Sequence, residues 1–133
     1  MQIVIAYIAT AIVFFALDVV GLRLLIRPVF ERHIPDLLLQ GYRAGPAIVF
    51  YLFYIGALIW FVSLPALRAG MPLQALWQGA LLGALAYGTY EFTNYATLKD
   101  WHPAMVATDL AWGTFLTGIS AWAGVAISRA LTA

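Results

Sequence analysis

The stretch that most constrains the fold is residues 46–67, which contain no charged side chain at all. A bilayer's hydrocarbon core is about 30 Å thick and takes roughly 20 apolar residues per helical crossing. Three further apolar runs flank this one, at residues 3–26, 73–98 and 104–127. Residues 1–133 are therefore predicted to be a single integral membrane domain. It is an all-α, four-helix antiparallel transmembrane bundle with a short interfacial segment between the first two helices.

Composition agrees with this prediction and excludes several kinds of protein. The 133 residues are 64% hydrophobic and 10% charged, with a mean hydropathy of +0.90 and a net charge of +1. A nearly neutral chain offers no basic surface for nucleic acid. Cysteine is absent, which removes disulfides, thiol catalysis and thiolate metal sites. The apolar start has no basic segment before it, so we expect a mature helix and not a cleaved signal peptide.

Basic residues are unevenly divided between the two ends of such a bundle. The first and third connections share one end, which holds Arg23, Arg27, Arg32, Arg43 and Lys99. The other end has only Arg68 and Arg129. Cytoplasmic connections carry the excess of lysine and arginine, so both termini are expected outside.

The third apolar run has two different faces at helical spacing. Small and polar residues share one face: Ala80, Gly83, Ala84, Tyr87, Glu91, Asn94 and Leu98. Leu81, Leu82, Leu85 and Phe92 lie on the other face and are predicted to contact lipid. Because an acid is costly against acyl chains and small residues let helices approach, the first face should point inward, together with Gly113 and Ser120 of the fourth run.

Three acids fall at one depth in this arrangement. At about 1.5 Å per residue, Asp18 lies roughly 13 Å below Arg27, Glu91 roughly 12 Å below Lys99 and Asp109 roughly 9 Å below Pro103. Three carboxylates in a low-dielectric site cannot all remain ionised, so at least one should bind a proton, pair with Arg23 or Lys99, or hold a cation. We therefore predict a buried acidic site with these three acids as candidate catalytic groups.

Other polar and aromatic residues are predicted to surround this site as substrate-binding groups. They are Asn94, Tyr54, Tyr87, Tyr90, Thr97, Trp112, Arg23 and Lys99. Trp60, Trp77, Trp101 and Trp122 instead fit interfacial or lipid-facing positions. A simpler interpretation is that the acids only hydrogen-bond the helices together, although amides and hydroxyls would do so at lower cost.

The segment from Ala86 to Trp101, AYGTYEFTNYATLKDW, followed by Asp109-Leu-Ala-Trp-Gly113, resembles a bacterial family of small integral membrane proteins known only as a domain of unknown function. The resemblance covers the whole chain and implies a multi-pass protein of the bacterial inner membrane. Its pattern, AYGTY[DE]xTNxATLxxW, usually has aspartate where Glu91 stands, and a Trp-Leu-Gly where this chain has Gly21-Leu-Arg23. The family name implies no activity.

Three functions remain open from the sequence. The first is acid–base chemistry on a lipid-like substrate, or binding of such a ligand. The second is proton- or cation-coupled transport, and the third is an accessory role in a membrane complex. The expected partners are the lipid bilayer, a lipid-like ligand, and a second copy or another membrane protein, and the Gly79/Gly83 spacing is weak evidence for a dimer. No cofactor is evident, and oxygen ligands alone would favour magnesium, calcium or manganese over zinc.

Overall fold

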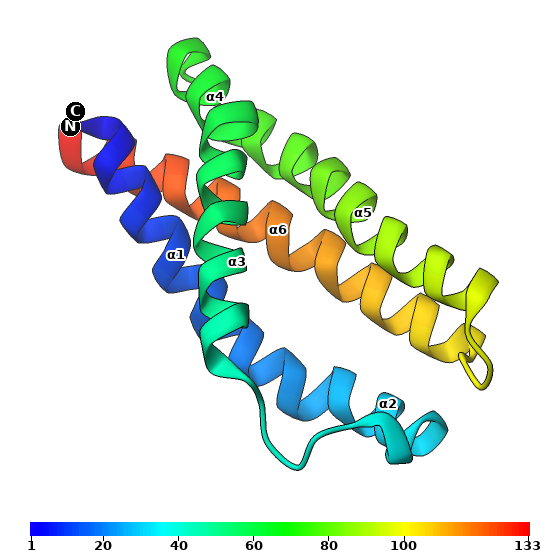
Figure 1. Ribbon diagram of the computed structural model, residues 1–133. Helices are drawn as coiled ribbons and strands as arrows, with labels where there is room; N and C mark the ends of the chain where they lie inside the picture. The colour runs from blue at the N-terminus through cyan, green and yellow to red at the C-terminus, as the bar shows by residue number, and fades with distance from the viewer.

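The computed structural model describes all 133 residues, which form an all-α bundle without strands. Its elements are α1 (Gln2–Gly21), η1 (Leu22–Ile26), α2 (Arg27–His33), η2 (Pro35–Leu37), α3 (Ala44–Leu58), η3 (Ile59–Ser63), α4 (Leu64–Ala69), α5 (Pro72–Thr97) and α6 (Pro103–Thr132). Both termini lie at one end of the bundle, and α2 and the α5–α6 connection lie at the other end (Figure 1). A helical bundle satisfies every backbone group internally, as hydrocarbon requires.

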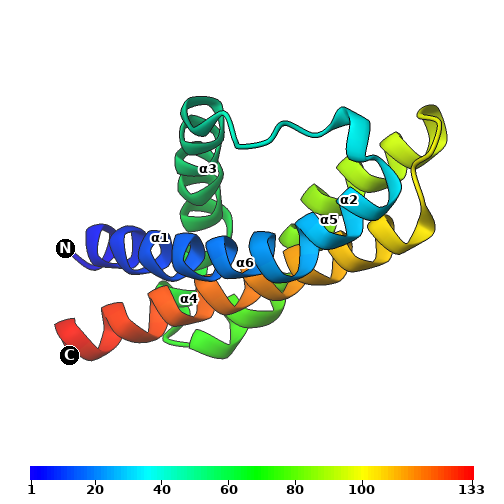
Figure 2. The ribbon, with the colours of Figure 1, turned by 90° about the horizontal axis from the view of Figure 1, so that it is seen from below.

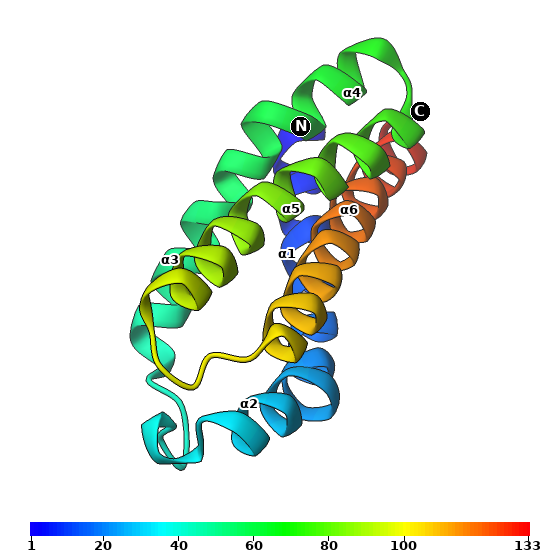
Figure 3. The same cartoon turned by 90° about the vertical axis from the view of Figure 1, so that its right-hand side faces the viewer.

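Three continuous helical stretches are long and apolar enough to cross a membrane: Gln2–His33, Ala44–Ala69 and Pro103–Thr132. The fourth, α5, has the length but is more polar, because it carries Gln74, Gln78 and Glu91. It lies antiparallel to α6 and forms the most extensive helix pair in the molecule (Figure 3). Its polar residues can therefore be covered by protein while it crosses beside α6.

The first helix continues beyond Ile26, where the sequence predicted its end, as far as His33. The reason is a π-helical turn, η1, in which the Arg27 N–H donates to the Leu22 carbonyl. The wider turn accommodates Pro28, which lacks an N–H and would otherwise press on the preceding turn. The second crossing repeats this arrangement, since the π turn η3 directly precedes α4 and Pro65. The interfacial segment is consequently shorter than predicted.

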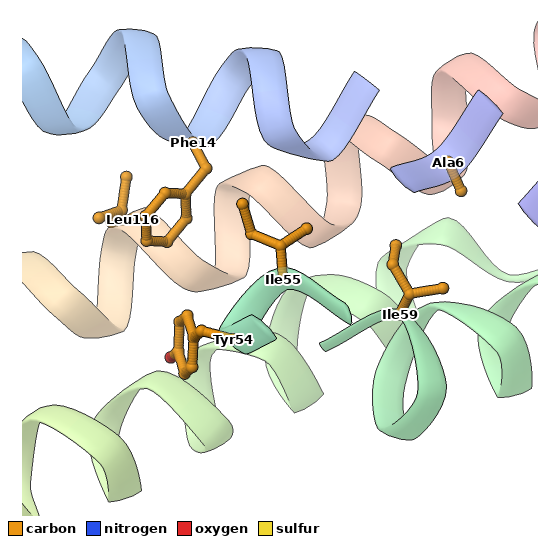
Figure 4. Close-up of a cluster of buried hydrophobic side chains, with 6 residues drawn as sticks. All are labelled: Ala6, Phe14, Tyr54, Ile55, Ile59 and Leu116. Atoms are coloured by element: carbon orange, nitrogen blue, oxygen red, sulfur yellow. The ribbon is translucent and has the colours of Figure 1, made fainter. Parts of the chain in front are cut away.

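Helix α3 crosses its neighbours at a marked angle, most clearly when the bundle is viewed from below (Figure 2). Among the long helices, α3 contacts mainly α1. The elements η3 and α4, which continue the same helical stretch, contact α5 and α6 as well. Figure 4 shows the cluster at this junction, in which Phe14 of α1 and Leu116 of α6 converge on Tyr54 and Ile55 of α3. The start of α3 therefore stands away from the rest of the bundle.

Helix α5 points its small and polar face inward and its leucine-rich face outward, largely as the sequence predicted. Glu91 is completely buried, while its neighbour Phe92 is 58% exposed, and Leu81 and Leu85 are also exposed. Leu82 is an exception, because it is half-buried against the cluster around Leu58 and Val125. Of the residues predicted to be buried, Gly113 and Ser120 are fully buried, while Ala80, Ala84 and Tyr87 are half-buried.

Close approach of α5 and α6 depends on glycine. A Cβ atom placed on Gly83 would lie 2.4 Å from the Gly113 carbonyl oxygen, and one on Gly79 would lie 3.0 Å from the Ala121 Cβ. The small face of α5 is therefore filled by α6 of the same chain. The Gly79/Gly83 spacing, which had suggested a dimer contact, serves packing within one subunit.

We expect Gly83→Val to destabilise the protein by about 1–3 kcal/mol, because the side chain would force α5 and α6 apart. The matched control is Gly88→Ala on the same helix, where an added Cβ meets only Leu110 Cδ1 at 3.4 Å. Thermal unfolding in detergent measures both variants. Equal midpoints for Gly83→Val and the control would contradict this helix contact.

Candidate functional site

Glu91 is held inside the bundle by the tryptophan that follows its helix. The chain turns back after Thr97, and Trp101 Nε1 donates a hydrogen bond to Glu91 Oε1 at 3.0 Å. Trp101 is itself 8% exposed and packs edge-on against Phe30 of α2, with ring centroids 5.4 Å apart. The interfacial or lipid-facing position predicted for Trp101 is therefore wrong, whereas Trp60, Trp77 and Trp122 are exposed as predicted.

Asp109 faces Glu91 across the contact between α5 and α6. Both acids are buried, and they are close enough for the protonation of one to affect the other. Glu91 Oε2 has no hydrogen-bond partner. An ionised carboxylate is only an acceptor, so two carboxyl groups can hydrogen-bond only when one of them carries a proton. A proton shared between the two acids would therefore satisfy Glu91 Oε2.

Asp18 lies on the other side of Asp109. It is buried on α1 and near enough to Asp109 for their charges to interact. Trp112 of α6 fits against this part of α1, where a Cβ on Gly21 would lie 2.2 Å from the indole ring. Asp109 is therefore the central acid, paired closely with Glu91 and more loosely with Asp18. No group of three His, Cys, Asp or Glu side chains is placed to hold a metal ion.

A cavity of about 420 Å³ lies between the start of α3 and the other helices. Its lining is mainly apolar and aromatic: Leu22, Ile26, Arg27, Phe30, Leu38, Tyr42, Phe50, Tyr51, Tyr54, Ala86, Tyr87, Tyr90 and Asp109. Of the three predicted acids, only Asp109 lines it. Asp18 and Glu91 are neighbours of Asp109 that lie outside the cavity wall.

The other predicted binding residues divide into two groups. Tyr54, Tyr87 and Tyr90 line the cavity. The Tyr54 hydroxyl is 3.0 Å from Thr117 Oγ1, and the Tyr87 hydroxyl is buried without a partner. Outside the cavity lie Asn94 and Trp112, which are half-buried, and Arg23, Lys99 and Thr97, which are exposed. Neither Arg23 nor Lys99 forms an ion pair with an acid.

Sequence reasoning missed the cation that does line the cavity. Arg27 Nε donates to Glu31 Oε1 at 2.7 Å, and its guanidinium lies 5.0 Å from the ring centroid of Tyr42. It also donates to the Leu39 carbonyl. Arg27 and Glu31 are four residues apart, the spacing of an ion pair on a helix. This signal was overlooked because the first helix was predicted to end before Pro28. Tyr51 is the second lining residue that was missed.

We expect Trp101→Phe to destabilise the protein by about 1–3 kcal/mol, because it keeps most of the packing but removes the donor to a buried carboxyl oxygen. Trp77→Phe, at a lipid-exposed position on α5, is the control and should change little. Chemical or thermal unfolding in detergent measures the difference. Equal effects of the two substitutions would show that the Glu91–Trp101 bond does not stabilise the fold.

Comparison with known proteins gives a family but no activity. No curated protein and no solved structure shows a significant match to the chain. The family described as "Predicted membrane protein (DUF2177)" matches residues 3–126, which is nearly the whole chain. The buried acids and the cavity fall within this match, together with most of each long helix. The chain therefore belongs to the predicted membrane protein family DUF2177.

Proposed function

We propose that this protein binds a lipid-like ligand in the cavity beside α3 and presents it with the acid pair of Asp109 and Glu91. The observation that carries the proposal is the composition of the cavity, which is apolar apart from a few placed polar groups. Ligand sites in proteins commonly have this character, with volumes of roughly 300–1,000 Å³. A pocket lined in this way accepts an apolar body and orients it through one carboxyl group.

Two exposed residues of the cavity lining support a ligand that arrives from the bilayer. Phe50 on α3 and Tyr90 on α5 both line the cavity and are 57% and 53% exposed. At about 1.5 Å per residue, each lies roughly 9–11 Å along its helix from the end nearest α2. The two side chains therefore place exposed cavity lining at membrane depth, where acyl chains would surround the protein.

The acid pair gives the site a chemical capability beyond binding. Glu91 is sealed behind Trp101, while Asp109 reaches the cavity wall. A proton held between them can pass to a ligand group at Asp109 or be taken from it, which is the role of a general acid or base. The same arrangement serves a binding protein if the ligand leaves unchanged. Mass spectrometry of the ligand before and after incubation with the protein distinguishes these two outcomes.

Filling the cavity tests the proposal. We expect Ala86→Phe, a substitution in the cavity wall, to reduce labelling by a photoactivatable alkyl amphiphile by about tenfold, equivalent to about 1.4 kcal/mol of binding. Ala96→Phe is the matched control, because Ala96 is exposed on the same helix and lies outside the cavity. Peptide mapping of the wild-type adduct should place the label near Phe50 or Tyr90. Labelling that is equal in both variants would contradict the proposal.

A further inference from the structure

The cavity is unusually rich in aromatic rings. Five tyrosines and two phenylalanines are among its 13 lining residues. The face of an aromatic ring carries partial negative charge and attracts a cation, and quaternary ammonium ligands are commonly held in this way. The ring of Tyr42 already shows this behaviour, because the Arg27 guanidinium lies 5.0 Å from its centroid.

The charges around the cavity also favour a cation. Asp109 is the only acid in the lining, and Arg27 is the only base. Arg27 already forms an ion pair with Glu31, in which Nε and Oε1 are 2.7 Å apart. No arginine or lysine forms an ion pair with Asp109. The charge that remains available to a ligand is therefore the carboxyl group of Asp109. A positive group that reaches it also gains contact with the tyrosine rings.

We propose that the ligand is a lipophilic organic monocation, such as a quaternary ammonium, a phosphonium or a protonated amine on an apolar body. This inference rests on the proposed function, since it names the ligand class for the same cavity. The volume of about 420 Å³ lies toward the lower end of the range for small-molecule sites, which favours a compact ring system or a single chain over a diacyl lipid.

The acid pair determines how the cation and protons compete. Asp109 faces the cavity and has Glu91 of α5 and Asp18 of α1 as acidic neighbours, so in the cation-bound form Asp109 carries the negative charge while Glu91 keeps a proton. Acidification adds a proton to Asp109 and removes that charge. Binding therefore weakens as the pH falls, and each bound cation excludes one proton from the site.

The test uses two ions of the same shape and opposite charge, tetraphenylphosphonium and tetraphenylborate. Equilibrium dialysis of the purified protein in an uncharged detergent, against protein-free micelles, measures each affinity. Tetraphenylphosphonium should bind saturably and at least about tenfold more tightly than tetraphenylborate, a difference of about 1.4 kcal/mol or more. Its affinity should fall on acidification. Asp109→Asn should weaken it by about tenfold, whereas Asp36→Asn, in the exposed segment after α2, should not.

A second set of variants leaves the buried acids untouched. Tyr90→Leu should weaken tetraphenylphosphonium binding severalfold, Tyr90→Phe should retain it, and Tyr95→Leu, which is exposed outside the cavity, should have no effect. Equal affinity for the two ions, or equal affinity of Tyr90→Leu and Tyr90→Phe, would overturn the inference. If the alkyl photoprobe still labels the cavity in that case, the proposed function stands and only the ligand class is wrong. If neither probe enters the cavity, both proposals fail.

Discussion

A carboxyl group inside a membrane requires a partner, and the rest of this structure can be understood from how Glu91 is accommodated. Placing an acid at membrane depth costs at least about 2.5 kcal/mol by insertion scales. Trp101 offsets part of this cost by donating a hydrogen bond to one carboxyl oxygen, and Asp109 faces the same side chain from α6. Both contacts require α5 and α6 to be close, which the glycines at positions 83 and 113 allow. The most polar of the four long helices thereby buries its acid against its neighbour.

The second constraint is the attachment of α3 at one end only. Its later part and η3 pack into the cluster around Ile55 and Leu116, while its first residues are exposed. This separation creates the cavity and exposes one member of the acid pair, Asp109, to it. If α3 were packed against the bundle along its whole length, all the acids would be closed off from the surroundings. Different parts of the chain therefore provide stability and the proposed ligand access. The α1, α5 and α6 contacts provide stability, and the start of α3 would provide access.

Much of the fold followed from periodicity and chain length. Four apolar runs predicted four long helices, and the two faces of α5 placed Glu91 inward and Phe92 outward. Local rules failed where a distant contact decided the outcome. Trp101 was expected at the membrane interface, because nothing in the sequence near it shows that the loop folds back onto Glu91. Pro28 suggested a helix end, but a π turn carried the helix past it.

Local patterns in the sequence also predicted part of the candidate site, but not the part that depends on distant contacts. Counting residues along each helix predicted that the acids lie at one depth and that the tyrosines at positions 54, 87 and 90 lie near them. These three tyrosines line the cavity together with Asp109. It could not supply the crossing angle of α3, so neither the cavity nor Arg27 was foreseen. It also overestimated Arg23 and Lys99, whose long side chains remain at the exposed surface. Helical periodicity fixes which face a residue occupies, whereas a cavity depends on how two helices diverge.

The central claim is that Glu91 and Asp109 face each other between α5 and α6. Because the chain has no cysteine, a cysteine pair can be introduced without background. In native membranes, Glu91→Cys combined with Asp109→Cys should react rapidly with a short thiol-to-thiol cross-linker. Phe92→Cys combined with Asp109→Cys should not, since residue 92 points to lipid. Equal cross-linking of the two pairs, or none in the first, would contradict the account.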